Sequence, residues 1–116
     1  MEKKNLKKLI DDLGFTCVAN ENLLDREVNS AYVSDLLSDV MGKAQPQMLW
    51  VTSQIHKNIV AVASLIELSA IVIVNERKPD EEMLKLAQEE GVVVLTSDNP
   101  AFETAGLLYN YLNTAP

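Results

Sequence analysis

The sequence predicts an α/β fold in which a mostly parallel sheet carries helices on both faces. One pattern occurs three times: an apolar run ends in small polar residues, and a helix start follows. The three runs are residues 48–51, 70–74 and 92–95. Their nearly continuous apolar composition is typical of strands buried on both faces of a parallel sheet. Because the strand-to-helix turns of such a sheet line up along one edge, where ligands bind, the pattern also predicts the location of a site.

The first half of the chain predicts two helices and two extended segments. Leucine and isoleucine recur at helical spacing from Leu6 to Leu13, and Gly14 follows as a helix stop. In order, the predicted elements are a helix at 3–13, a strand at 15–19, a less regular extended segment at 26–33, and a short helix that begins at Ser34 or Asp35 and ends at Gly42.

The second half alternates regularly between strands and helices. The predicted elements are strands at 48–53, 70–74 and 92–96 and helices at 57–67, 80–90 and 100–112. Pro100 suits the first position of the last helix, so Asn99 is its expected N-cap. We expect the inward face of this helix to be formed by Phe102, Ala105, Tyr109 and Leu112.

Length, charge and cysteine content limit the class of protein. With 116 residues, the chain is expected to form a single domain over 1–116. A net charge of −7 argues against binding to nucleic acid or to an anionic membrane surface. It does not argue against a small phosphorylated ligand, because backbone amides can hold an anion locally.

Two further observations predict a cytoplasmic location. The only cysteine, Cys17, lies in an apolar run, so a buried structural thiol in a reducing compartment is expected. The N-terminus lacks the apolar stretch of a signal peptide, and the apolar stretch at 59–74 is too short to span a membrane.

No motif in the sequence indicates catalysis, a metal or a cofactor. The four glycines are not spaced as a dinucleotide-binding or P-loop motif. His56 is the only histidine, so a zinc site is disfavoured. Asp35 and Asp39 stand four residues apart on a predicted helix, where a solvated polar face is the expected interpretation. Trp50 lies in a predicted buried strand and is expected in the core.

The candidate ligand-binding residues follow the predicted strands. They are Thr52, Gln54, His56 and Asn58 after the first of the three runs, and Thr96 and Ser97 after the last. His56 has two interpretations: a ligand-contacting or acid/base group at a helix start, or a helix cap. Arg26, in the charged triplet at 25–27, is the seventh candidate; it either binds an anion or a backbone carbonyl, or forms a surface ion pair.

The chain resembles the DRTGG domain family. The resemblance is carried by residues 25–28, 31–41, 49–52 and 54–63 and by a C-terminal pattern: a Pro-Asp-Glu-Glu helix start, a Val-Leu-Thr-Ser strand end and an Ala-Gly-Leu-Leu-Tyr helix. It is strongest over 15–112. The chain departs from the family's glycine-rich signature, because 74–76 reads Val-Asn-Glu where a Thr-Gly-Gly-like turn is expected.

The resemblance implies an α/β domain similar to the N-terminal domain of HPr kinase/phosphorylase. Family members occur alone, beside CBS domain pairs or within phosphotransacetylases, in a presumed regulatory role. The family supplies no catalytic residues. The P-loop domain that carries the kinase chemistry is a separate one, so the resemblance implies no kinase activity.

These observations favour a cytoplasmic, non-catalytic regulatory or ligand-sensing domain that forms a homo-oligomer, expected to be a dimer. The expected partner is a small molecule, such as a phosphorylated compound or a nucleotide, or a partner enzyme. Two alternatives stay open: a small enzyme that acts on a phosphorylated substrate with His56 as acid/base, and a pure protein-interaction module. The sequence does not identify the ligand, the partner or the pathway.

Overall fold

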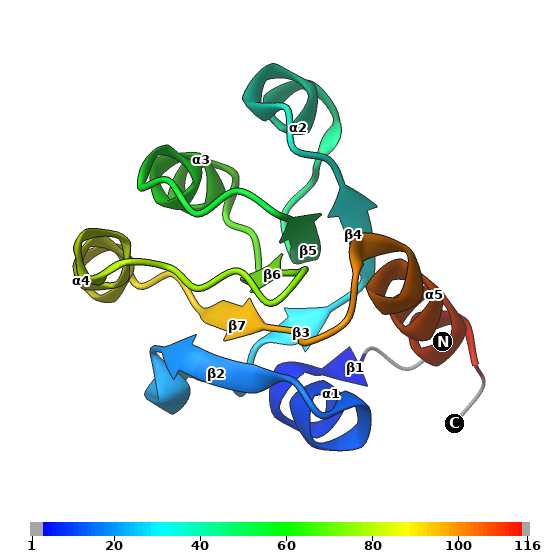
Figure 1. Ribbon diagram of the computed structural model, residues 1–116. Helices are drawn as coiled ribbons and strands as arrows, with labels where there is room; N and C mark the ends of the chain where they lie inside the picture. The colour runs from blue at the N-terminus through cyan, green and yellow to red at the C-terminus, as the bar shows by residue number, and fades with distance from the viewer. Residues whose placement is uncertain (1–3, 115–116) are drawn as a thin grey trace.

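The protein is built around a five-stranded sheet with the order β2-β7-β6-β5-β4 (Figure 1). The computed structural model describes residues 4–114. Four strands run parallel: β4 (Ser30–Val33), β5 (Met48–Thr52), β6 (Ala70–Ile73) and β7 (Val94–Thr96). The edge strand β2 (Thr16–Ala19) pairs antiparallel with β7, with a bulge between Cys17 and Ala19. The predicted fold class, a mostly parallel sheet, is confirmed.

Helices cover both faces of the sheet, as predicted. Helices α2 (Leu37–Lys43), α3 (Asn58–Ile66) and α4 (Glu81–Glu90) lie on one face, and α1 (Leu6–Leu13) and α5 (Ala101–Asn113) lie on the other (Figure 1). Two short strands, β1 (Lys4–Asn5) and β3 (Glu27–Val28), form a separate antiparallel pair, and a 3-10 turn, η1 (Glu21–Leu23), follows β2.

Each face of the sheet has its own hydrophobic core. On the α2–α4 face, Trp50, Ile71 and Ile73 pack with apolar side chains of α3 and α4. On the α1/α5 face, Leu49 and Val72 pack with residues of α1 and with Leu108. Trp50 is fully buried, as expected, and its indole Nε1 donates to the Ser34 carbonyl at 2.8 Å. Burial of each such side chain contributes roughly 1.5–3 kcal/mol to folding.

Several predicted boundaries differ from the structure. The first helix begins at Leu6, where Asn5 caps it by accepting from the Lys7 amide at 2.9 Å; the predicted start, residue 3, lies outside the described residues. The extended segment at 26–33 is divided into β3 and β4. Gly42 does not end α2, which continues to Lys43. Cys17 is half-buried rather than buried, because it lies on the edge strand; partial burial still raises the pKa of its thiol.

The predicted inward face of the last helix is wrong for Phe102 and Tyr109, whereas Leu112 packs against the core as predicted. Phe102 and Tyr109 are 85% and 74% exposed, whereas Thr104 and Leu108 are buried. The helix is rotated because the Thr104 hydroxyl lies 3.0 Å from the Ser97 hydroxyl, so a polar residue can face the core. Pro100, rather than Asn99, is the N-cap residue.

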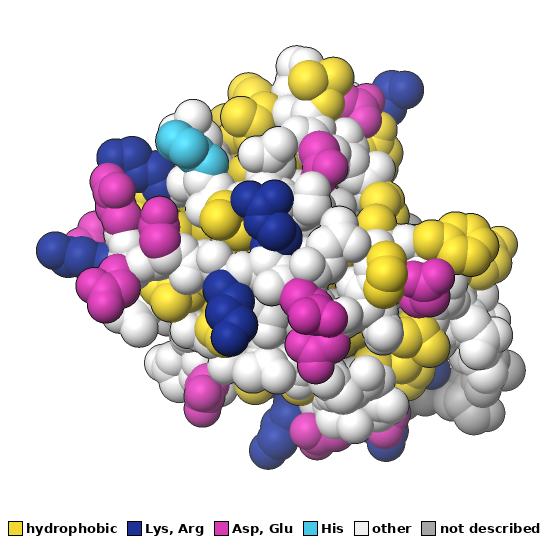
Figure 2. Space-filling model, viewed as in Figure 1, with side chains coloured by type: hydrophobic (Ala, Val, Ile, Leu, Met, Phe, Trp, Pro, Cys, Tyr) yellow, Lys and Arg dark blue, Asp and Glu magenta, His cyan; other side chains and the backbone are white. Residues whose placement is uncertain are grey.

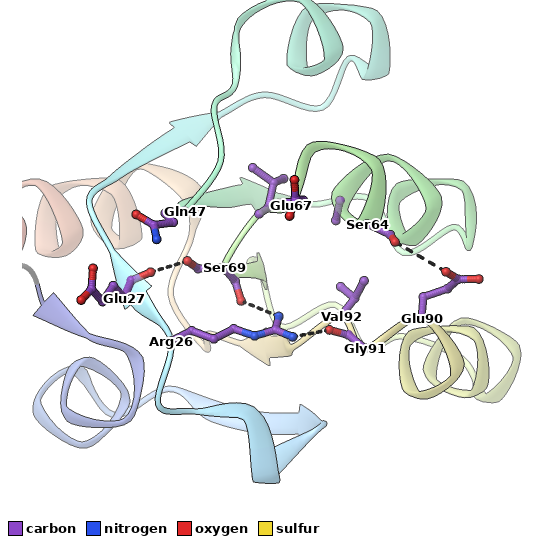
Figure 3. A pocket seen from close by; sticks show the side chains of 11 residues that line it. Arg26, Glu27, Gln47, Ser64, Glu67, Ser69, Glu90, Gly91 and Val92 are labelled. Atoms are coloured by element: carbon purple, nitrogen blue, oxygen red, sulfur yellow. Dashed lines mark hydrogen bonds between the residues drawn. The ribbon is translucent and has the colours of Figure 1, made fainter.

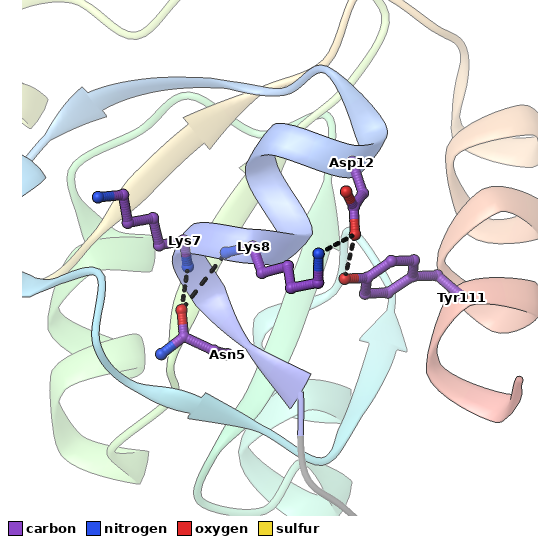
Figure 4. A network of polar contacts seen from close by, with 5 residues as sticks. All are labelled: Asn5, Lys7, Lys8, Asp12 and Tyr111. Carbon is purple, nitrogen blue, oxygen red and sulfur yellow. Dashed lines mark hydrogen bonds and ion pairs between the residues drawn. The ribbon is translucent and has the colours of Figure 1, made fainter. Parts of the chain in front are cut away.

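A polar cluster joins α1 to α5 (Figure 4). The Tyr111 phenol donates to Asp12 at 2.7 Å, and Lys8 lies 3.7 Å from the same carboxylate. Partial burial and the bond to Asp12 raise the pKa of Tyr111 to about 12. The phenol therefore stays protonated, and donates, throughout the neutral pH range.

We expect Tyr111→Phe to lower the free energy of unfolding by about 1 kcal/mol at pH 7, since it removes one hydrogen bond between the two helices. Urea denaturation followed by circular dichroism measures the change. Tyr109→Phe is the matched control and should leave the midpoint unchanged, because the Tyr109 phenol forms no hydrogen bond within residues 4–114 and the substitution keeps the ring. Equal midpoints for both variants would show that the Tyr111–Asp12 bond contributes nothing.

Candidate functional site

The carboxyl ends of the four parallel strands meet at one edge of the sheet. Strand β4 is followed by Ser34 and Asp35, β5 by Ser53, β6 by the loop 74–80, and β7 by the loop 97–100. Figure 2 shows basic and acidic side chains close together on this face, with the single histidine near them. The edge is therefore polar and charged although the sheet behind it is apolar.

Asp35 joins the ends of β4 and β5. One carboxylate oxygen accepts from the Thr52 hydroxyl at 2.7 Å and from the Ser53 amide at 2.8 Å, and the other accepts from the Ser53 hydroxyl at 2.9 Å. Partial burial raises the pKa of Asp35, but these three hydrogen bonds and the nearby positive charge of Arg77 outweigh it and lower the pKa below its usual value.

Asp35 and Asp39 are accessible to solvent, as expected, but they do not share a helix face. Asp35 precedes the helix and crosses to β5, and Asp39 accepts from the Tyr32 phenol at 2.8 Å. The sequence signal for Asp35 was its position two residues after Val33, where the predicted extended segment ends.

The loop between β6 and α4 contains two consecutive residues with unusual backbone angles. Asn75 and Glu76 have φ angles of 63° and 58°, so two consecutive non-glycine residues are left-handed. The Asn75 amide donates to the Asn99 carbonyl at 3.0 Å, which ties this loop to the loop after β7. Such a conformation costs roughly 1–2 kcal/mol for each residue with a side chain.

This loop presents Arg77 and Lys78 to a cavity of 320 Å³ at the ends of β6 and β7. The other lining residues are Glu76, Thr96, Ser97 and Asp98. Within residues 4–114, no hydrogen bond or ion pair engages the guanidinium of Arg77 or the ammonium of Lys78. The two cations, which the sequence analysis did not select, stand three and four residues after the apolar run at 70–74, in the polar segment that follows the strand.

The predicted residues after β5 are only partly available. Thr52 is buried, and its hydroxyl donates to Asp35 and accepts from the Gln54 amide. Gln54, His56 and Asn58 are exposed. The His56 Nδ1 accepts from the Asn58 amide at 3.2 Å, so this ring nitrogen caps the start of α3.

Thr96 and Ser97, the predicted residues after β7, line the 320 Å³ cavity. Ser97 is buried, and its hydroxyl pairs with Thr104. Thr52 and Thr96 both pair with Ile73 of β6, so one strand separates them by about 10 Å. The structure therefore places them at the same edge but not in one cavity: Thr52 and Asp35 line a separate space of 80 Å³.

Arg26 lies at the opposite end of the sheet from the other six residues (Figure 3). Its guanidinium donates to the Gly91 carbonyl at 2.7 Å and approaches the Ser69 carbonyl at 3.5 Å, at the starts of β7 and β6. It borders a cavity of 370 Å³ whose lining also includes Glu67 and Glu90. Arg26 therefore binds backbone carbonyls here.

Comparison with known proteins identifies the family. A family model described as the DRTGG domain matches residues 8–111. This chain belongs to the DRTGG domain family. The resemblance found in the sequence is thereby confirmed. No curated protein matches the chain.

A solved structure with the same fold also contains a DRTGG domain. It is the crystal structure of the CBS and DRTGG domains of the regulatory region of Clostridium perfringens pyrophosphatase, complexed with the activator diadenosine tetraphosphate. The TM-score is 0.70 at 18% sequence identity, and the likeness covers 90% of this chain and 45% of that chain. At this identity the likeness supports the fold of this DRTGG domain.

The chain departs from the glycine-rich signature of the family at a turn whose backbone is left-handed. The resemblance places a Thr-Gly-Gly-like turn at 74–76, and the backbone of this DRTGG domain is left-handed at 75 and 76. Glycine adopts that conformation without strain, whereas Asn75 and Glu76 do not. The loop thus keeps a glycine-type conformation without glycines.

Two structural absences concern the described part of the chain. No helix within residues 4–114 is long and apolar enough to cross a membrane. In the same part of the chain, no three His, Cys, Asp or Glu side chains are grouped as metal ligands.

We expect Glu76→Gly to be more stable than Glu76→Ala by about 1 kcal/mol, because glycine removes the strain of a positive φ and alanine keeps it. Thermal or urea denaturation of the two variants measures the difference. The alanine variant is the matched control, since both substitutions remove the same carboxylate. Equal stability would mean that the turn is not strained at residue 76.

We expect Asp35 to contribute to acid sensitivity. Because its pKa is lowered in the folded state, its stabilising effect is present at neutral pH and is lost as the pH falls through the folded-state pKa. Asp35→Asn should therefore melt below the wild type at pH 7, and the difference should narrow at pH 3. A constant difference across melting curves from pH 7 to 3 would contradict this assignment.

Proposed function

We propose that this DRTGG domain is a non-catalytic regulatory domain that binds a small phosphorylated ligand, of the nucleotide class, at the carboxyl edge of its sheet. The observation that carries the proposal is the cavity bordered by Arg77 and Lys78. Both cations lie in a chain with a net charge of −7, and neither forms an ion pair or a side-chain hydrogen bond within residues 4–114. Phosphate oxygens accept the hydrogen bonds that these two groups have available.

The other groups of the cavity suit the rest of a nucleotide. Glu76 and Asp98 also line it, and carboxylates accept hydrogen bonds from ribose hydroxyls in other α/β domains. Thr96 adds a hydroxyl from the end of β7. The volume of 320 Å³ lies at the lower end of the range for small-molecule sites, which fits a mononucleotide better than a larger ligand.

The related pyrophosphatase regulatory region supports the same class of ligand. It contains a DRTGG domain beside CBS domains, and it was crystallised with a dinucleotide activator. In that protein, a DRTGG domain is therefore part of a nucleotide-regulated assembly. This chain spans 45% of that chain, so we propose the regulatory role for the domain and not the pyrophosphatase activity.

The contacts of His56 favour a structural role over a catalytic one. Its Nδ1 already caps α3, and no described carboxylate bonds to its ring within residues 4–114. A general base is normally held in position by such a group. We also propose that the whole chain folds as one domain, that it acts in the cytoplasm, and that it self-associates as a dimer.

The test is a thermal-shift and calorimetric titration with ATP, AMP, adenosine and inorganic phosphate. A ligand at about 100 times its Kd adds about 2.7 kcal/mol to the native state, which raises the melting midpoint by roughly ten degrees or more. The nucleotides should produce this shift, adenosine should not, and the doubly substituted Arg77→Gln, Lys78→Gln protein should lose it.

The matched control is Lys43→Gln, Lys85→Gln, which removes the same charge from exposed positions on α2 and α4. It should bind like the wild type. Retention of binding by the Arg77/Lys78 variant, or no shift with any compound, overturns the proposed ligand site. Chromatography of the nucleotide after incubation checks the non-catalytic assignment: conversion that depends on His56 would favour an enzyme.

A further inference from the structure

The strongest apolar feature of the surface is a groove between α5 and the edge strand β4. Its volume is 530 Å³, and it is lined by Asn29, Ser30, Ala31, Val33, Phe102, Ala105, Gly106, Leu108, Tyr109, Leu112 and Asn113. Figure 2 shows hydrophobic side chains gathered on the side of the molecule where Figure 1 places α5. Phe102 and Tyr109 project most, with 85% and 74% of their surfaces exposed.

We infer that this face is the interface between two copies of the chain. Here "dimer face" means the groove residues given above. The inference rests on the self-association included in the proposed function, and it names the surface and its anchors. Phe102 of each copy enters the groove of the other across a two-fold axis, with the two α5 helices side by side.

Charge favours a second copy as the occupant. None of the lining residues is charged, although 23% of the chain is charged and its net charge is −7. Two molecules with the same negative charge repel when their charged surfaces meet. An uncharged face lets identical chains associate without placing like charges opposite one another.

Shape also favours a second copy. A two-fold interface brings the same surface from both partners together, so that surface must be complementary to itself. The dimer face carries both parts: aromatic side chains that project and a groove beside them. No atom lies within 4 Å of the position that a Cβ of Gly106 would occupy. The surface of α5 is therefore recessed at Gly106, which leaves room for a side chain of the partner.

The available area is of the right order. Two aromatic side chains exposed to this extent offer roughly 300 Å² for burial. A stable interface buries about 800 Å² on each partner, and aromatic residues are its usual anchors. Phe102 and Tyr109 therefore supply more than a third of the required area, and Val33, which is half-exposed, adds to it.

The neighbouring edge strand does not block the approach. Edge strands that must stay single usually carry a charged residue, a proline or a bulge. Strand β4 has the sequence Ser-Ala-Tyr-Val, and it pairs with β5 in unbroken register. Its outer side thus lacks these protective features.

The test is measurement of the molecular mass in solution by light scattering and by analytical ultracentrifugation from 1 to 200 µM. The wild type should have twice the mass of the 12.8 kDa chain. Phe102→Glu should raise the dimer dissociation constant at least 100-fold and leave the melting curve at low concentration unchanged, because Phe102 is exposed in the single chain.

Two further variants keep the outcome decisive. Leu65→Glu, at a side chain of α3 that is 71% exposed, introduces the same charge on another face and should stay dimeric. Gly106→Leu adds no charge and fills the groove, so it should also dissociate the dimer. A wild type that is monomeric at 200 µM overturns the assignment. So does a dimer that is dissociated by Leu65→Glu but persists in Phe102→Glu.

Nucleotide titrations of Phe102→Glu separate this inference from the proposed ligand site. Binding by a monomeric variant supports both assignments. A dimeric wild type that binds no nucleotide leaves the dimer face standing and removes the ligand site, and a monomeric wild type that binds nucleotide does the reverse.

Discussion

The structure depends on the complete burial of its central strand, β6. The run at 70–74 has no exposed surface, and its side chains alternate between the two cores. Ala70, Val72 and Val74 pack toward α1 and α5, while Ile71 and Ile73 pack toward α3 and α4. A strand that is apolar on both faces can place polar groups only at its two ends. The two polar regions of the molecule lie at those ends.

The two ends differ in how their polar groups are satisfied. At the start of β6, the Ser69 hydroxyl donates to the Glu27 carbonyl, and Arg26 reaches the Gly91 and Ser69 carbonyls. Protein groups therefore bind one another there, and Arg26 holds the segment after η1 to the sheet. At the other end, Asp35 accepts three hydrogen bonds from Thr52 and Ser53, whereas Arg77 and Lys78 border a cavity. This difference makes the carboxyl edge the better candidate for a ligand.

The sequence predicted the elements that local chemistry determines. Runs such as 70–74 and stops such as Gly14 and Gly91 depend on near neighbours, so the strands and helices were found, with errors of a few residues at their ends. The orientation of α5 was missed because it depends on the pairing of Thr104 with Ser97, and periodicity alone favoured the aromatic side chains as the buried ones. Hydrophobicity ranks Phe102 above Thr104, but a satisfied hydroxyl can be buried at little cost.

The site was predicted at the level of the sheet edge and not of the cavity. Residues that follow parallel strands share an edge, which is why Thr52, Thr96 and Ser97 were placed there correctly relative to the sheet. Which of them share a cavity depends on the strand order, and β6 stands between β5 and β7. Arg26 lies at the far end because β3 precedes the sheet strand β4, a feature of the chain's path that no local pattern specifies.

The loop after β7 connects the proposed ligand site with the proposed dimer face. Thr96, Ser97 and Asp98 line the cavity, and Phe102 stands in the first turn of the helix that this loop begins. The Ser97–Thr104 pair fixes the loop to that turn. The loop and the first turns of α5 are thus joined by a direct contact. By thermodynamic linkage, a ligand that binds the dimer more tightly than the monomer must strengthen dimerisation by the corresponding factor. A regulatory domain can act in this way, because the ligand changes association and no reaction is needed.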